Sequence, residues 1–136
     1  CLPVGLWSES VRLRFATSSS MFVTESRIVD DAIEMNHGSN VSKGDTYIDT
    51  VSIDERFISE KVSFIKMDIE GAETEAIRGA MNIIKRDKPK LAISIYHKKE
   101  DIYEIPLLIN EICPEYKFYL RHFSSHLCET VLLATT

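Results

Sequence analysis

A buried strand leading into an acidic turn is encoded in Val62-Ser63-Phe64-Ile65-Lys66-Met67-Asp68-Ile69-Glu70-Gly71. Residues 62–67 are mostly apolar and are flanked by polar residues, which predicts a strand with its side chains in the core. From Ala72 to Ile84 the apolar residues instead recur at helical spacing, with acidic residues early and basic residues late, as the helix dipole favours. A strand followed at once by a helix is the repeating unit of α/β folds.

Further strands and helices are predicted on both sides of this unit. Alternating or continuous apolar patterns predict strands at residues 11–15, 46–51, 91–95, 116–120 and 130–134. Helices are expected near residues 27–35, over residues 54–59 after a capping Ser52, and from residues 103–105 to just before Pro114. Gly79, inside the helix that starts at Ala72, is expected to allow close packing. This order of elements predicts an α/β domain with a mainly parallel sheet.

Composition and charge exclude several classes of protein. With 136 residues, of which 44% are hydrophobic, the chain can bury one core and is too short for two ordinary domains. Its net charge is -5 and its basic residues are not clustered, so nucleic acid is not expected as its main partner. No apolar run approaches the roughly 20 residues of a membrane-spanning helix. We therefore expect a cytoplasmic protein without a membrane partner, with reduced thiols because the three cysteines show no paired spacing.

Polar side chains follow three of the predicted strands. Ligands of open α/β sheets bind at the carboxyl ends of the parallel strands, and this rule selects Asp68 and Glu70 after residues 62–67, Tyr96 and His97 after residues 91–95, and Arg121 and His122 after residues 116–120. Asp68 or His97 is suited to take a proton from a substrate hydroxyl. The acidic turn has a second interpretation of about equal weight, in which both carboxylates only cap the following helix. A single histidine, likewise, is more often a solvated loop residue than a catalytic group.

Two functions of other classes are open for the same residues. Carboxylates together with imidazoles suit several divalent ions, and a metal-dependent hydrolase would use as ligands Asp68, Glu70, His97 and His122. A non-catalytic interaction module is the other alternative. The five glycines lie far apart and form neither a dinucleotide-binding motif nor a P-loop.

A longer pattern around the acidic turn carries a family resemblance. Lys66-Met67-Asp68-Ile69-Glu70-Gly71-Ala72-Glu73, followed by Arg78-Gly79-Ala80, resembles the K-x-D-x-E-G-x-E…K-G-A signature of FkbM-type methyltransferases. Similar segments occur at residues 50–54, 94–98, 116–122 and 129–132. The resemblance covers about residues 46–134 and extends to residues 1–15.

The resemblance implies a fold and a cofactor. The expected fold is the Rossmann-like class I methyltransferase sheet, mainly parallel with a C-terminal antiparallel strand, and the expected cofactor is S-adenosylmethionine. The family's opening strands and its glycine loop have no counterpart in a chain that begins at Cys1, so residues 1–136 are expected to be the C-terminal part of a single methyltransferase domain. Such an incomplete sheet would expose an apolar edge, which favours a homo-oligomer.

The resemblance also implies roles for six residues. The reaction would be methyl transfer to an oxygen, on a sugar or glycan-related hydroxyl. Asp68, Glu70 and His97 would be catalytic, Asp68 with Val4 and Gly5 would contact the cofactor, and Glu70, His97 and His122 would contact the substrate. No metal ligand is assigned.

Overall fold

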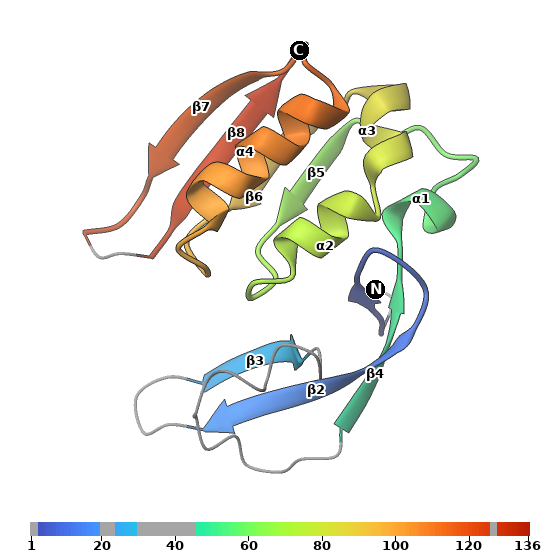
Figure 1. The fold of residues 1–136 in the computed structure, drawn as a ribbon, viewed down its shortest axis with the longest axis vertical. Helices are drawn as coiled ribbons and strands as arrows, with labels where there is room; N and C mark the ends of the chain where they lie inside the picture. The colour runs from blue at the N-terminus through green and yellow to red at the C-terminus, as the bar shows by residue number, and fades with distance from the viewer. Residues whose placement is uncertain (1–2, 20–23, 30–45, 126–127) are drawn as a thin grey trace.

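The computed structural model describes residues 3–19, 24–29, 46–125 and 128–136, which form two four-stranded sheets and four helices (Figure 1). The α/β class expected from the sequence is confirmed. The single, mainly parallel sheet is not found, since four of the six strand pairings are antiparallel. Of the described cysteines, Cys113 is a buried free thiol and Cys128 an exposed one.

The N-terminal sheet has the strand order β1-β4-β2-β3. Its strands are β1 (Gly5–Leu6), β2 (Arg12–Ser19), β3 (Thr24–Val29) and β4 (Thr46–Val51). Only β1 and β4 pair in parallel, whereas β2 is antiparallel to both β3 and β4. A helix was expected near residues 27–35, and this prediction is wrong for residues 27–29. These residues belong to β3, where Val29 pairs with Arg14 of β2. The rest of that segment lies outside the described residues.

The C-terminal sheet has the strand order β5-β6-β8-β7. Its strands are β5 (Phe64–Met67), β6 (Lys90–Ser94), β7 (Lys117–His122) and β8 (Thr130–Thr135). The pairing of β5 with β6 is parallel, and β8 lies antiparallel between β6 and β7. Because β6 and β7 are each antiparallel to β8, the strands β5, β6 and β7 all point the same way. Their carboxyl ends therefore lie at one edge, and the expected C-terminal antiparallel strand is confirmed.

The helix expected from Ala72 to Ile84 is interrupted. It forms two helices, α2 (Glu73–Arg78) and α3 (Met81–Asp87), separated at Gly79 and Ala80. The carboxylate of Asp54 accepts hydrogen bonds from the backbone N–H groups of Asn82 and Ile83, at 3.0 and 2.8 Å, and so satisfies the start of α3. The break thus depends on a side chain that lies far away in the sequence.

The two remaining helices form where the sequence predicts helices, but with different bounds: the first ends at Arg56 instead of Ser59, and the second begins at Asp101. Helix α1 (Ile53–Arg56) is capped by Ser52, whose side chain accepts from the backbone N–H of Glu55 as predicted. Helix α4 (Asp101–Ile112) begins earlier than expected, so that Pro106 is its sixth residue and stands beyond the first turn. None of the helices in the described ranges has the length and apolarity needed to cross a membrane.

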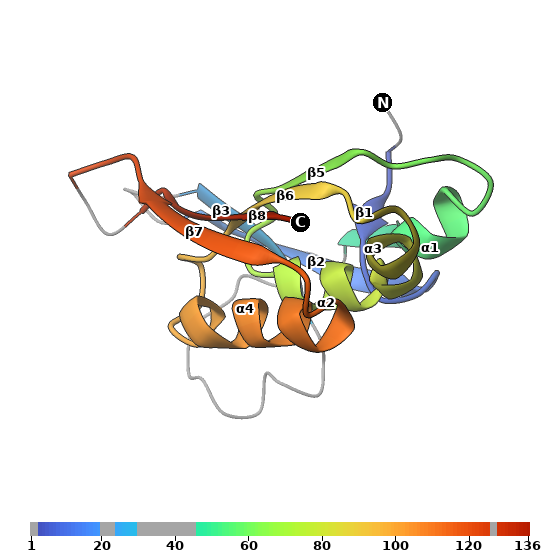
Figure 2. The same ribbon diagram turned by 90° about the horizontal axis from the view of Figure 1, so that it is seen from above.

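The core lies between the C-terminal sheet and the helices on one of its sides. Helices α2 and α4 lie on the same side of this sheet in Figure 2. Apolar side chains from all of these elements are buried there, among them Met67, Ile77, Ile93, Ile105 and Ile109. On the other side of β5 the side chain of Phe64 is 57% exposed, so β5 is buried on one face only, where burial on both was expected.

Candidate functional site

A tight turn at the carboxyl end of β5 holds two of the predicted carboxylates. The backbone N–H of Ala72 donates to the carbonyl oxygen of Ile69 at 3.3 Å, and the two residues between them, Glu70 and Gly71, have φ angles of 57° and 90°. Two successive positive φ angles define a type I′ turn, which favours glycine at the second position. Glu70 is held in a conformation that non-glycine residues seldom adopt and that is often found at functional sites.

The alternative in which these carboxylates only cap the next helix is not supported. Helix α2 begins after Ala72, and no side chain makes a capping hydrogen bond at this position. The side chains of Asp68 and Glu70 are 42% and 52% exposed, so both can reach a ligand. The acidic turn is therefore free for another role.

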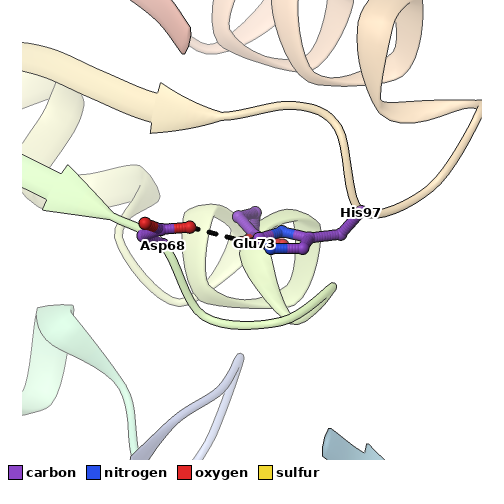
Figure 3. Close-up of side chains that lie close together, drawn as sticks. All are labelled: Asp68, Glu73 and His97. Atoms are coloured by element: carbon purple, nitrogen blue, oxygen red, sulfur yellow. Dashed lines mark ion pairs between the residues drawn. The ribbon is translucent and has the colours of Figure 1, made fainter. Parts of the chain in front are cut away.

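His97 comes from the carboxyl end of the neighbouring strand, β6, and points toward the acidic turn (Figure 3). Its side chain is only 9% exposed. The Nε2 atom lies 3.7 Å from Oδ1 of Asp68 and 3.7 Å from Oε2 of Glu70. Three of the residues selected by the sequence rule, Asp68, Glu70 and His97, thus lie together.

Glu73 is a member of this cluster that the sequence argument missed. Its side chain is completely buried, and its Oε1 atom accepts a hydrogen bond from the backbone N–H of Ile69 at 2.9 Å. The same oxygen lies 2.9 Å from Nδ1 of His97, within ion-pair distance but without the alignment of a hydrogen bond. The sequence assigned Glu73 to the helix dipole. Glu73 stands three and four residues before Ala76 and Ile77, so it lies on the apolar face of α2. This spacing could have predicted that its side chain is buried.

Tyr96 is a second group to which the sequence gave no role. Its hydroxyl donates a hydrogen bond to Oδ1 of Asp68 at 3.1 Å, and its ring lies 4.2 Å from that of His97 between centroids. Burial, assisted by the hydrogen bond to Asp68, raises the pKa of Tyr96 to about 12. Tyr96 therefore remains a protonated donor at neutral pH and fixes one oxygen of Asp68.

The loop that carries His97 is itself fixed by a buried carboxylate. Asp101, 2% exposed, accepts a hydrogen bond from the backbone N–H of Lys98 at 3.0 Å. Burial is the main cause that raises the pKa of Asp101 above its ordinary value. The contact bridges the residue after His97 to the first turn of α4, which limits the positions that the imidazole can take.

His122 lies at the same edge of the sheet but outside the cluster. It ends β7 instead of following it, and its Nδ1 atom is 2.8 Å from Oγ1 of Thr130. Strand β8 separates β7 from β6, which places the two parallel strands about 10 Å apart. A substrate contact by His122 therefore remains a prediction.

The predicted cofactor contacts lie in the other sheet. Gly5 opens β1 and pairs with Thr50 of β4, and Val4 precedes it. Among the described residues, the polar partners of Asp68 are Tyr96, Lys66 and His97, so neither Val4 nor Gly5 is paired with it. Their role also remains a prediction.

A hollow of about 450 Å³ lies among the helices, and none of its lining residues belongs to the cluster. Its lining residues belong to the end of α2, to α3 and to the second half of α4: Arg78, Met81, Lys85, Leu108, Glu111 and Ile112. These segments lie toward the opposite end of the strands from Asp68 and His97. No side chain of the acidic turn contributes to this hollow.

Comparison with known proteins gives the family. The model of the methyltransferase FkbM domain matches residues 4–125. The crystal structure of methyltransferase FkbM from Methylobacillus flagellatus KT is similar to this chain, with a TM-score of 0.68 and 30% sequence identity. The similarity covers 96% of this chain and 27% of that one, so the chain spans about a quarter of its structural relative. No curated protein gave a significant match. The chain belongs to the FkbM methyltransferase domain family.

Proposed function

We propose that this chain carries the acceptor side of an S-adenosylmethionine-dependent O-methyltransferase that acts on a sugar or glycan-related hydroxyl. The observation that carries the proposal is the contact of one nearly buried imidazole with three carboxylates at the carboxyl ends of two parallel strands. Membership of a methyltransferase family supports this assignment over a hydrolase or a non-catalytic module.

The proposed chemistry is alignment of the acceptor and removal of its proton. The cofactor, when bound, supplies the electrophilic methyl group. Asp68 or His97 accepts the proton of the acceptor hydroxyl, because both lie at the rim and their side chains face each other at 3.7 Å. Glu70 orients the acceptor through its exposed carboxylate, and His122 contacts a more distant part of the substrate.

Only some of the described residues are suited to contact the cofactor. The sulfonium group of S-adenosylmethionine is positively charged, and the exposed carboxylate of Asp68 has the charge to face it. Neither Gly71 nor Gly79 offers a cradle, because a Cβ atom at each would meet Lys98 at 3.2 Å and the backbone oxygen of Trp7 at 2.2 Å. We therefore assign to this chain the sulfonium contact of Asp68 and the outlying contacts of Val4 and Gly5.

Methyl transfer by the complete enzyme tests the proposal. Labelled S-adenosylmethionine is offered with a panel of sugars and nucleotide sugars, and product is expected with at least one hydroxyl acceptor. Asp68→Asn and His97→Gln should each lower turnover by about 100-fold or more, the usual contribution of a positioned base. Glu75→Gln is the matched control, since Glu75 lies on the outer side of α2 and pairs with Arg78. Transfer to no hydroxyl acceptor would overturn the reaction, and full turnover in both variants would overturn the site.

A further inference from the structure

Three side chains of the cluster have the composition and spacing of metal ligands. Asp68, Glu73 and His97 each offer one ligand atom, and these atoms all lie within 4.8 Å of one another. They come from the end of β5, the first turn of α2 and the loop after β6 (Figure 3). Three separate elements thus converge on one point.

Buried atoms in this cluster lack partners. The Oε2 atom of Glu73 and both ring nitrogens of His97 are buried and have no hydrogen-bond partner among the described residues. The side chains themselves are 0% and 9% exposed. Buried polar atoms are almost always paired, and an unpaired carboxylate oxygen is among the most unfavourable groups to bury. These buried atoms therefore call for a positively charged partner.

Among the described residues no Lys or Arg pairs with the buried atoms of Glu73 and His97, although the side-chain stem of Lys98 lies beside Gly71 of the acidic turn. In the described part of the chain the only Lys or Arg paired with the cluster is Lys66, whose Nζ atom lies 3.8 Å from Oδ2 of Asp68 in an exposed contact. Even a protonated His97 would bring one positive charge against the three carboxylates within 3.7 Å of its nitrogens, those of Asp68, Glu70 and Glu73. A divalent cation would offset two of the three negative charges with His97 neutral as its ligand, and Lys66 would offset the third.

We propose that Asp68, Glu73 and His97 bind one divalent transition-metal ion, Mn²⁺ or Zn²⁺. An imidazole with two carboxylates suits these ions better than Mg²⁺, which prefers oxygen ligands throughout. Ligand atoms about 2.1 Å from an ion in tetrahedral geometry lie about 3.4 Å apart, so the widest pair of the cluster must close by up to about 1.4 Å. Asp68 is the ligand able to move, because its side chain is 42% exposed.

The surroundings fit such a site. Tyr96 donates a hydrogen bond to Asp68, and the backbone N–H of Ile69 donates to Glu73, so two of the ligands are oriented by outer contacts. Three protein ligands leave coordination positions open, as in catalytic metal sites. In the proposed methyltransferase an acceptor oxygen would occupy an open position and lose its proton more readily there. With the ion bound, Asp68 and His97 would promote loss of that proton as ligands of the ion and not as free bases. That last role rests on the proposed function, whereas ion binding does not.

Calorimetric titration of the complete, metal-stripped protein with MnCl₂ and with ZnCl₂ tests the site. We expect one bound ion per chain with at least one of the two metals. Asp68→Asn, Glu73→Gln and His97→Gln should each weaken binding by about 100-fold or more, since loss of an outer contact alone already costs 10- to 100-fold. Glu75→Gln and His122→Gln are the matched controls and should bind within about twofold of the wild type, because neither side chain touches the cluster.

A spectroscopic readout keeps the result independent of activity and of folding. Bound Mn²⁺ should show a nitrogen coupling in pulsed electron paramagnetic resonance, and His97→Gln should remove it. If the buried Glu73→Gln variant does not fold, the exposed Asp68→Asn variant decides. Binding of neither ion, or binding that Asp68→Asn and His97→Gln leave unchanged, would overturn the site. Ion binding without methyl transfer would support the metal site and contradict the proposed function. Methyl transfer that resists a chelator, without ion binding, would support the proposed function and contradict the metal site.

Discussion

The Nδ1 atom of His97 lies 2.9 Å from Oε1 of the completely buried Glu73. This contact orients the imidazole so that its other nitrogen, Nε2, faces the two exposed carboxylates of the acidic turn at 3.7 Å. A buried carboxylate behind a histidine is a recurrent way to fix the orientation and tautomer of a catalytic or metal-binding imidazole. The turn after β5 and the helix α2 that follows it thus supply the carboxylates on both sides of His97.

Glu73→Ala should lower the free energy of unfolding by about 1 kcal/mol, because it leaves the part-buried backbone N–H of Ile69 without its acceptor. Urea denaturation followed by the fluorescence of Trp7, the single tryptophan, measures the change. Glu75→Ala is the control and should change stability by about 0.5 kcal/mol or less, since its ion pair with Arg78 lies at the surface. Equal effects of the two substitutions would show that Glu73 is not held as described.

Gly71→Ala should destabilise the protein by about 1 kcal/mol, because its φ of 90° belongs to glycine and the added Cβ would lie 3.2 Å from Cε of Lys98. The turn also positions Glu70, so the variant should lower methyl transfer more than its loss of stability explains. Thermal denaturation and turnover, measured on the same preparation, separate the two effects. A variant with the stability and turnover of the wild type would contradict the turn geometry.

For Gly79→Ala, helix propensity and the packing of the structure predict opposite changes in stability. Helix propensity alone predicts stabilisation by about 1 kcal/mol. A Cβ atom at this position would lie 2.2 Å from the backbone oxygen of Trp7, so we expect destabilisation by about 1–3 kcal/mol as the segment is pushed away. A shift of Trp7 fluorescence in the folded variant would report the displacement. Stabilisation by alanine would show that Trp7 does not pack on this glycine.

The sequence identified the rim of the sheet and three of its residues for a physical reason. Parallel strands end at the same edge, and the apolar runs before Asp68 and His97 mark those strands clearly. What it missed depends on contacts between distant segments. The break between α2 and α3 depends on Asp54, and the separation of His122 from the cluster depends on β8 lying between β6 and β7. The order of elements along the chain does not encode either relationship.

Stability in acid should depend on Asp87. A hydrogen bond from Arg86, together with one from the backbone N–H of Val62, lowers the pKa of Asp87 from 3.8 to about 2. Because the pKa is lower in the folded state, the ionised carboxylate stabilises the fold above about pH 4, and this contribution disappears as the pH falls toward 2. The difference in unfolding free energy between wild type and Asp87→Asn should therefore shrink over that interval. Urea denaturation at several pH values measures it, and a constant difference would contradict the assignment.

A crystal structure of the protein with S-adenosylhomocysteine and a hydroxyl acceptor would show directly whether the acceptor binds at the acidic turn. We predict that the acceptor oxygen lies within about 3.2 Å of a side-chain atom of Asp68 or His97, or on a metal ion that these residues bind. An acceptor seated elsewhere, for example in the hollow lined by α3 and α4, would contradict the account.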